Sequence, residues 1–226
     1  MAKTGKDYQN PTDYYDGSYF EKQSAGGDLQ GELNKFKFAK FIKSSDSVLD
    51  FGCGSGALLR SLKLPTAQIM GLEINKVAVA YAKSRGTPVR TDMNDLKDET
   101  FDVVISNHAI EHVHNPYETI VSLGRVLKKG GKLIVVVPCD VASTHFSEDD
   151  YDQHFFSWSA GNLGNLIQST GLRVISSEAI AHKWPPKWQV IHGIVGANLF
   201  HKICRLWAIV DRNRAQVRCV AEKPFP

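Results

Sequence analysis

The chain has 226 residues, of which 42% are hydrophobic and 23% charged, so its length and composition are typical of a soluble α/β domain that buries a core of its own. A formal net charge of +3 is too small to indicate a nucleic-acid-binding protein. The four cysteines form no CxxC pair and the first 20 residues hold no long apolar segment, so we expect free thiols, no secretory signal and a cytoplasmic location.

Strands and helices alternate along most of the chain. Residues 1–27 show no periodicity and predict a loop or an arm, and Asp28–Ile42 has the apolar spacing of one amphipathic helix. The expected strands are Ser47–Asp50, Gln68–Ile74, Thr87–Arg90, Phe101–Ser106, Lys132–Val137, Leu172–Ile180 and Gln216–Glu222. The expected helices between them are Ala57–Lys63, Lys76–Arg85, Tyr117–Lys128 and Ala160–Thr170. This alternation predicts an α/β fold with a doubly wound, mostly parallel sheet and helices on both faces.

The helix at Tyr117–Lys128 has clear boundary signals. Asn115 can cap its start and Pro116 suits the first helical position. Two glycines, Gly130 and Gly131, follow it and predict that the helix has ended before them.

Three glycines on alternate positions follow the first expected strand, in the stretch SVLDFGCGSGALL. In a parallel sheet, ligands bind at the carboxyl ends of the strands, and glycine there lets the backbone approach a ligand closely. Gly52, Gly54 and Gly56 therefore predict a ligand site, and Asp50 lies on the strand directly before them. Their Gly-x-Gly-x-Gly spacing differs from the Gly-x-Gly-x-x-Gly of dinucleotide folds, which disfavours a nicotinamide-dependent oxidoreductase.

Two further acids stand at the ends of the next strands. Glu73, in GLEIN, has the place of a carboxylate that accepts hydrogen bonds from both hydroxyls of a ribose. Asp92, in RTDMNDL, is placed to accept a bond from an adenine amine. The two acids together favour a nucleoside ligand.

Five segments in this order resemble the motif series of class I S-adenosylmethionine-dependent methyltransferases: VLDFGCGSG, GLEIN, TDMNDL, FDVVISNHAIEHV and VLKKGGKLIVVVP. The similarity covers Val48–Pro138, and weaker similarity continues through HFFSWSAGNLGNLIQSTGL. It implies the seven-stranded, Rossmann-like methyltransferase fold and S-adenosylmethionine as cofactor.

The resemblance also implies roles for single residues. Asp50 and the glycine turn would hold the methionine end, Glu73 the ribose, and Asp92 with the backbone of Met93 the adenine, while Asn107 would lie near the sulfonium. The implied cofactor-binding residues are Asp50, Gly52, Cys53, Gly54, Gly56, Glu73, Ile74, Asp92, Met93 and Asn107.

On this basis we predict one methyltransferase domain over residues 1–226. Residues 1–45 form an N-terminal arm and a capping helix, residues 46–140 the cofactor-binding half, and residues 141–226 the acceptor-side half, with a helical insertion over 182–215.

Methyl transfer from a sulfonium is an in-line displacement, so the enzyme mainly aligns the reactants and, for a hydroxyl acceptor, removes a proton. The loops after the fourth and fifth strands should face the acceptor. The base candidates are His108, His145, Glu111 and His112, with His108 and His145 preferred; the same loops also offer His114, Asp140, Asp149, Asp150 and His154. There are two alternatives: Glu111 and His112 only shape the loop, or the reaction needs no base. We expect no metal, because this class usually works without one.

Two segments outside the motifs carry many aromatic residues. The arm stretch YYDGSYF can close over the cofactor or simply pack on the domain. The insertion can be a lid or acceptor wall, a dimer surface, a membrane-interfacial segment through 184–210, or a structural helix. Because Lys, Arg and His interrupt its apolar pattern, we do not expect it to span a membrane.

The predicted function is transfer of a methyl group to an O or N atom of a small molecule, such as a sugar or a secondary metabolite. A protein or other macromolecule methyltransferase, and a non-catalytic S-adenosylmethionine-binding partner subunit, are the alternatives, and a homodimer stays open. We expect no nucleic-acid substrate, since SNHA follows the fourth strand in place of an Asn/Asp-Pro-Pro-aromatic motif and the chain has no basic stripe.

Overall fold

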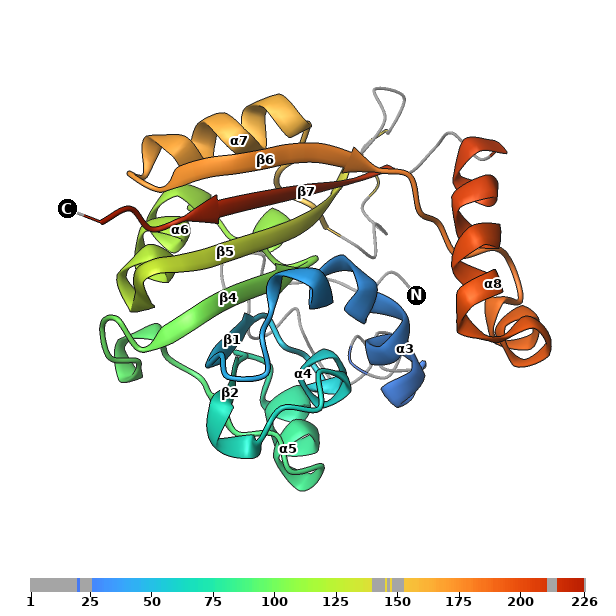
Figure 1. The fold of residues 1–226 in the computed structure, drawn as a ribbon, viewed down its shortest axis with the longest axis horizontal. Coiled ribbons are helices and arrows are strands. Elements are labelled where there is room, and N and C mark those ends of the chain that lie inside the picture. The colour runs from blue at the N-terminus through green and yellow to red at the C-terminus, as the bar shows by residue number, and fades with distance from the viewer. Residues whose placement is uncertain are drawn as a thin grey trace.

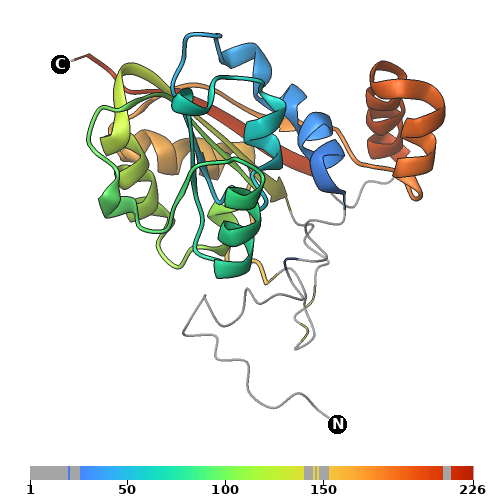
Figure 2. The same cartoon turned by 90° about the horizontal axis from the view of Figure 1, so that it is seen from below.

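A computed structural model describes Phe20 and residues 26–139, 145, 147, 153–210 and 215–225. They form a seven-stranded sheet of order β3-β2-β1-β4-β5-β7-β6, with helices on both faces (Figures 1 and 2). The strands are β1 Val48–Phe51, β2 Ile69–Leu72, β3 Val89–Arg90, β4 Phe101–Asn107, β5 Leu127–Cys139, β6 Arg173–Ile180 and β7 Ala215–Glu222. β7 runs antiparallel to both of its neighbours and the other pairs are parallel. The predicted doubly wound, mostly parallel sheet is confirmed.

Most helices lie where the sequence predicts them, with ends shifted by a few residues. They are α3 Gly27–Asn34, α4 Ala57–Ser61, α5 Lys76–Ser84, α6 Pro116–Val126, α7 Ala160–Ser169 and α8 Trp188–Val210. As predicted, the Asn115 side chain caps α6 by accepting a hydrogen bond from the backbone N–H of Glu118 at 3.2 Å.

The single helix predicted over Asp28–Ile42 is wrong. α3 ends at Asn34 and two short 3₁₀ turns follow, over Lys35–Lys37 and Ala39–Phe41. Leu33 packs against α8, whereas Phe38 packs into the core beneath the sheet. The chain changes direction between the two so that both side chains are buried, and this tertiary packing overrides the local helical pattern.

The predicted end of α6 is also wrong. The helix stops at Val126, and Leu127 begins β5 by pairing with Phe101 of β4. Leu127 is fully buried, so pairing with the sheet outweighs the two further residues of helix that the sequence pattern favours.

Each face of the sheet has its own apolar core. On one face β1, β4 and β5 pack with α4 and α5 through residues such as Leu59, Val79 and Ala82. On the other, α6 and α7 pack through residues such as Leu123 and Ile167. Together these cores hold the carboxyl ends of β1, β2 and β4 in fixed relative positions.

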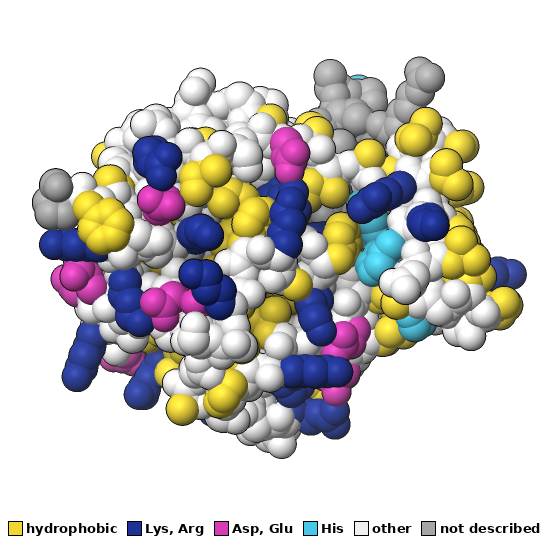
Figure 3. All heavy atoms as spheres, viewed as in Figure 1, with side chains coloured by type: hydrophobic (Ala, Val, Ile, Leu, Met, Phe, Trp, Pro, Cys, Tyr) yellow, Lys and Arg dark blue, Asp and Glu magenta, His cyan; other side chains and the backbone are white. Residues whose placement is uncertain are grey.

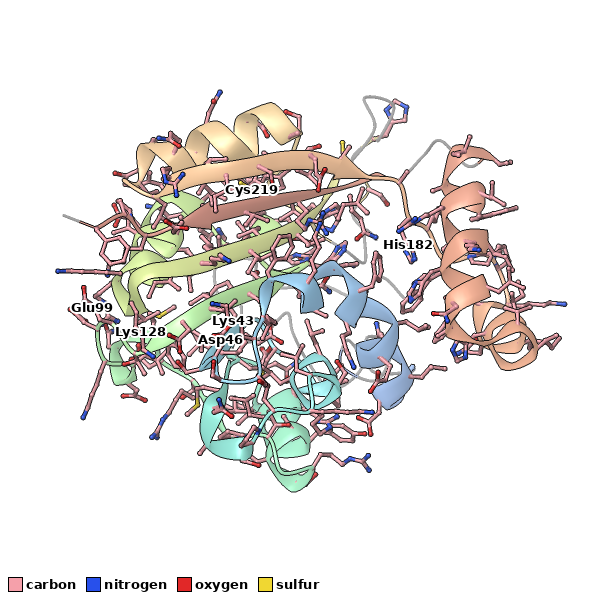
Figure 4. The ribbon with its side chains drawn as sticks, in the orientation of Figure 1. Lys43, Asp46, Glu99, Lys128, His182 and Cys219 are labelled. Carbon is pink, nitrogen blue, oxygen red and sulfur yellow. The ribbon has the colours of Figure 1, made fainter. Side chains whose placement is uncertain are left out.

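α8 stands beside this body and not within it (Figure 1). It touches the domain through a small cluster in which Phe200 and Cys204 pack against Leu33 of α3. His182 lies at the junction between the sheet and α8 (Figure 4), with Nε2 3.1 Å from Nδ1 of His201. Burial, with the charge of Lys37 nearby, lowers the pKa of His182 to about 3, so the His182 ring is uncharged near neutral pH.

Among the described residues, α8 alone is long and apolar enough to cross a membrane by length and composition, with a mean hydropathy of 1.2. The helix is this apolar even though it contains the basic residues and histidines from which the sequence predicts no membrane span. The helix is not continuous, however, because Gly196 has φ 70° and ψ 170° and interrupts it.

Candidate active site

The site begins at the turn that joins β1 to α4. Gly52 and Gly56 have φ of 71° and 72°, a backbone conformation that favours glycine. A Cβ on Gly52 would also lie 2.4 Å from the Cβ of Ala109, so the turn excludes a side chain there. At Gly54 no heavy atom of the described residues lies within 4 Å of the corresponding position, so a ligand can approach the backbone of the turn closely there.

A cleft lies over this turn. Its lining is Phe20, Gln30, Gly31, Asn34, Gly52, Cys53, Gly54, Ser55, Ala57, Leu58 and Asn107. One wall is α3, which lies directly on the start of α4: a Cβ on Gly31 would be 2.2 Å from the carbonyl oxygen of Ala57. The cleft thus joins the glycine turn, the end of β4 and the first helix. Phe20 is the one described residue of the predicted arm stretch YYDGSYF.

Glu73 is tied to the glycine turn. Its Oε2 accepts a hydrogen bond from the backbone N–H of Gly54 at 2.9 Å, and its Oε1 accepts one from that of Asn75 at 2.8 Å. A carboxylate has about four acceptor positions, so acceptor capacity remains for the hydroxyls of a ribose beside these backbone bonds. Burial raises the pKa of Glu73 above its usual value, and the backbone bonds oppose that rise.

Asp50, two residues before the turn, has a buried carboxylate oxygen that accepts no hydrogen bond from the described part of the chain. Its side chain is 2% exposed, and its Oδ1 has no hydrogen-bond partner among the described residues. Burial, together with the charge of Glu73, raises its pKa well above the usual range. Such an orphaned buried carboxyl fits a bound polar or cationic group, because leaving it unmatched is costly.

The other predicted cofactor residues take different places. Cys53 buries its side chain against β2, where a Cβ on Gly71 would lie 2.4 Å from its Sγ, so only its backbone serves the cleft. Ile74 is 43% exposed at the end of β2. Asp92 is exposed and accepts a bond from the N–H of Asn94, which caps the turn that begins at Met93. Ile74, Asp92 and Met93 thus follow β2 and β3 and do not line the cleft. Asp50 and Glu73 are not among its lining residues either, but they lie next to the glycine turn, which lines it.

Lys37 is a site residue that sequence reasoning missed. Its side chain is 2% exposed, and its Nζ donates to Oδ1 of Asn107 at 3.0 Å. Burial lowers its pKa to about 7, and the negative charge of Glu111 acts in the opposite direction. The position four residues after Leu33 places Lys37 on the apolar side of the expected helix, and that spacing is the signal that would have found it.

The loop after β4 gathers three of the predicted catalytic residues. His108 follows Asn107 with φ 57°, and its Nδ1 lies 3.5 Å from Oε1 of Glu111. His112 Nε2 lies 3.8 Å from the same oxygen. Glu111 is fully buried, and neither of its carboxylate oxygens has a hydrogen-bond partner among the described residues; burial works to raise its pKa, but the neighbouring His108 and His112 outweigh it and hold the pKa below its usual value. Glu111 is therefore an ionised carboxylate that orients His108.

Glu111, His112 and His154 also offer ligand atoms within 4.8 Å of one another. These residue types bind zinc in other proteins. Here the two histidine rings pack against each other edge to face, with centroids 5.1 Å apart. The expectation of no metal stays a prediction.

His145, the other preferred base, is exposed. Of residues 140–152 the structure describes only His145 and Ser147, so the candidates Asp140, Asp149 and Asp150 lie outside the described residues. The geometry therefore groups His108, Glu111 and His112 but does not place His145 with them.

Residues 26–177, more than half of the chain, match the methyltransferase domain family. The chain belongs to that family. Its fold is that of class I S-adenosylmethionine-dependent methyltransferases, and the strand order with β7 antiparallel is that of this class. The cleft, Glu73 and the orphaned Asp50 fit S-adenosylmethionine, the cofactor of the family.

Curated relatives give the next level of similarity. The chain is 30% identical over 132 residues to the ubiquinone biosynthesis O-methyltransferase of Vibrio parahaemolyticus, which is 49% of this chain and 56% of the relative. It is 34% identical over 125 residues to the enzyme of the same name from Aliivibrio fischeri strain MJ11, with 46% and 53% covered. The chain thus matches about half the length of these curated relatives.

Solved structures share the fold. A complex between the Haloferax volcanii Trm112 methyltransferase activator and a methyltransferase gives a TM-score of 0.72 at 21% identity, covering 96% of this chain and 99% of that one. Phosphoethanolamine N-methyltransferase 2 of Haemonchus contortus with S-adenosyl-L-methionine gives 0.68 at 17%, covering 100% and 62%. The [4+2]-cyclase SpnF gives 0.67 at 19%, covering 98% of each chain. At these identities the likeness concerns the fold alone.

Proposed function

We propose that the protein binds S-adenosylmethionine in the cleft above the glycine turn and transfers its methyl group to an oxygen or nitrogen atom of a small molecule. The observation that carries the proposal is the Glu73 carboxylate, held between the N–H groups of Gly54 and Asn75 beside an open glycine turn. Family membership and fold support it.

The chain's own residues divide the work. Glu73 accepts bonds from the ribose hydroxyls, Asp50 and the turn from Gly52 to Gly56 receive the polar methionine end, and Asn107 borders the reacting centre. When bound, S-adenosylmethionine supplies an activated methyl group on a good leaving group. The protein then needs to align the acceptor and exclude water, and α3 provides a wall for both.

His108 is the base in this proposal. Its Nδ1 faces the buried carboxylate of Glu111 at 3.5 Å, and its side chain is 34% exposed, so Nε2 is left for an acceptor hydroxyl. Glu111 acts through His108 as a positioning residue, because a neighbouring carboxylate fixes the tautomer and stabilises the protonated ring. His108 has a positive φ of 57°, a strained backbone conformation of the kind that clusters at active sites.

Oxygen is the favoured acceptor atom, since the curated relatives at 30–34% identity are named as O-methyltransferases. A sugar or a secondary metabolite remains our acceptor class. The buried thiols of Cys53, Cys204 and Cys219 support a cytoplasmic location, which we also propose.

The experiment is methyl release from labelled S-adenosylmethionine against panels of phenols, sugars and amines. Turnover on a hydroxyl acceptor should fall about 10²–10⁴-fold in His108→Gln, the range for loss of a general base. His114→Gln is the matched control, because His114 is exposed and stacks on Phe155 with ring centroids 4.6 Å apart. Equal turnover in His108→Gln and in the wild type would contradict the role of His108. Methylation of proteins but of no small molecule would contradict the acceptor class.

A further inference from the structure

The outer side of α8 carries large apolar side chains with no covering element. Its exposed residues include Val190 at 61%, Ile194 at 79%, Leu199 at 49%, Leu206 at 65%, Ile209 at 65% and Val210 at 74%. Figure 3 shows apolar side chains over this end of the molecule, next to Lys and Arg. Only 11% of the most apolar window of α8 is buried, whereas a core helix of similar hydropathy would be mostly buried.

On the segment after the break at Gly196, three of these residues form one strip, whereas Val190 and Ile194 lie before the break and Ile209 points about 60–100° away from the three. At about 100° per residue, Leu199, Leu206 and Val210 fall within about 40° of one another around the helix, whereas Phe200 and Cys204 lie about 100–140° from Leu199. Phe200 and Cys204 are the fully buried residues that hold α8 on the domain. The apolar strip therefore faces away from the body.

The break at Gly196 prevents α8 from crossing a bilayer as one helix. The segment after it, Ala197–Val210, has about 14 residues and a length of roughly 21 Å, short of the roughly 30 Å hydrocarbon core. A helix of this length with one apolar strip suits the plane of a membrane interface.

Charge distinguishes a lipid surface from a second copy of the chain. Lys187, Lys202 and Arg205 are exposed, and the sequence from 181 to 210 contains no Asp or Glu. Two copies packed through α8 would bring these cations together with no carboxylate from the segment to pair with them. Anionic headgroups complement the same cations.

We propose that α8 docks on the surface of an anionic lipid bilayer, with Ile194, Leu206 and Val210 in the interface and Lys202 and Arg205 at the headgroups. Because Leu33 of α3 packs on α8, docking brings the α3 wall of the cleft close to the bilayer. Vesicle binding needs no methyl donor, so the proposal stands or falls independently of the proposed reaction.

The test is sedimentation of the full chain with phosphatidylcholine vesicles, with and without phosphatidylglycerol. The wild type should bind the anionic vesicles at least about tenfold more tightly than the neutral ones, since each basic residue near an anionic surface contributes. The double variant Ile194→Asp, Leu206→Asp should lose at least about tenfold in affinity for anionic vesicles. Lys202→Glu with Arg205→Glu should abolish the preference for them.

Ile175→Asp is the matched control, because Ile175 on β6 is 48% exposed and lies outside α8. Circular dichroism of each variant establishes that it is folded. Absence of vesicle binding by the wild type, or equal binding by the folded Ile194→Asp, Leu206→Asp variant, overturns the proposal. The proposal is also overturned if the wild type is a dimer in sedimentation velocity and the same double variant is a monomer, because α8 then forms a dimer interface.

Discussion

Replacing Lys37 by methionine should stabilise the protein at neutral pH. Lys37 is 2% exposed and its pKa is lowered to about 7 from 10.5, so near neutrality the folded state holds its proton much less strongly than the unfolded chain. Folding therefore releases a proton, and for a lysine with a lowered pKa this weakens stability at and below pH 7. The weakening fades as the pH rises from about 7 towards 10.5.

The magnitude follows from the shift. With 1.36 kcal/mol per pKa unit, the titration of Lys37 costs about 4 kcal/mol at pH 7 and about 2.7 kcal/mol at pH 8.5. Methionine fills a similar volume without a charge, but the Oδ1 of Asn107 loses its donor, a loss of about 1 kcal/mol. We expect Lys37→Met to be about 2–3 kcal/mol more stable than the wild type at pH 7, with an advantage smaller by about 1.5 kcal/mol at pH 8.5.

Urea denaturation of both proteins at the two pH values measures this difference. Both proteins contain the same four cysteines, so the ionisation of the thiols cancels in the difference between them. Lys40→Met is the matched control, because Lys40 is an exposed lysine of the same segment. A wild-type-to-variant difference that is constant between the two pH values would refute the assignment of Lys37 as a buried amine that titrates near neutrality.

Two further predictions concern the stability of the fold. Gly31→Ala should destabilise the protein by about 1–3 kcal/mol, because its Cβ would lie 2.2 Å from the carbonyl oxygen of Ala57. Gly193→Ala is the control: no heavy atom in the described part of the chain lies within 4 Å of its Cβ position, so it should be neutral or stabilising. Equal melting temperatures for the two variants would contradict the close packing at Gly31. Because the pKa of His182 is lowered to about 3 from 6.5, its contribution to stability is complete above pH 6.5 and is lost as the pH falls towards 3. Between about pH 7.5 and pH 5 the loss is about 2 kcal/mol, and His182→Phe should remove that part of the acid sensitivity in denaturation curves; an unchanged acid profile in the variant would show that His182 does not titrate in this way.

The sheet was predictable because its strands are short apolar runs separated by turn residues. β1, β4 and β7 begin and end within about two residues of their predicted bounds, as is usual for patterns of this kind. The glycine turn and Glu73 were predictable for a different reason. Their places at consecutive strand ends follow from the order of elements alone.

The sequence-based predictions were wrong or incomplete where tertiary packing determines the local structure. α3 breaks after Asn34 because Leu33 and Phe38 are buried in separate clusters, and no local pattern contains that information. Lys37 meets Asn107 across 70 residues of sequence. The position of α8 at the side of the domain depends on which of its residues pack against α3, and the sequence does not contain that information. The sequence therefore left four alternatives open for this segment: a lid or acceptor wall, a dimer surface, a membrane-interfacial segment and a structural helix.

The central claim, that this cleft binds S-adenosylmethionine through Glu73, is tested most directly by calorimetric titration. The wild type should bind S-adenosylmethionine and S-adenosylhomocysteine with micromolar affinity and should not bind NADH. Glu73→Ala should weaken both by about 1–3 kcal/mol, roughly 5- to 150-fold, the loss expected for a charge-assisted pair of hydrogen bonds. Asp95→Ala, an exposed acid at the end of the turn after β3, should bind as the wild type does. Unchanged affinity in Glu73→Ala, or no binding of either nucleoside by the wild type, would contradict the account.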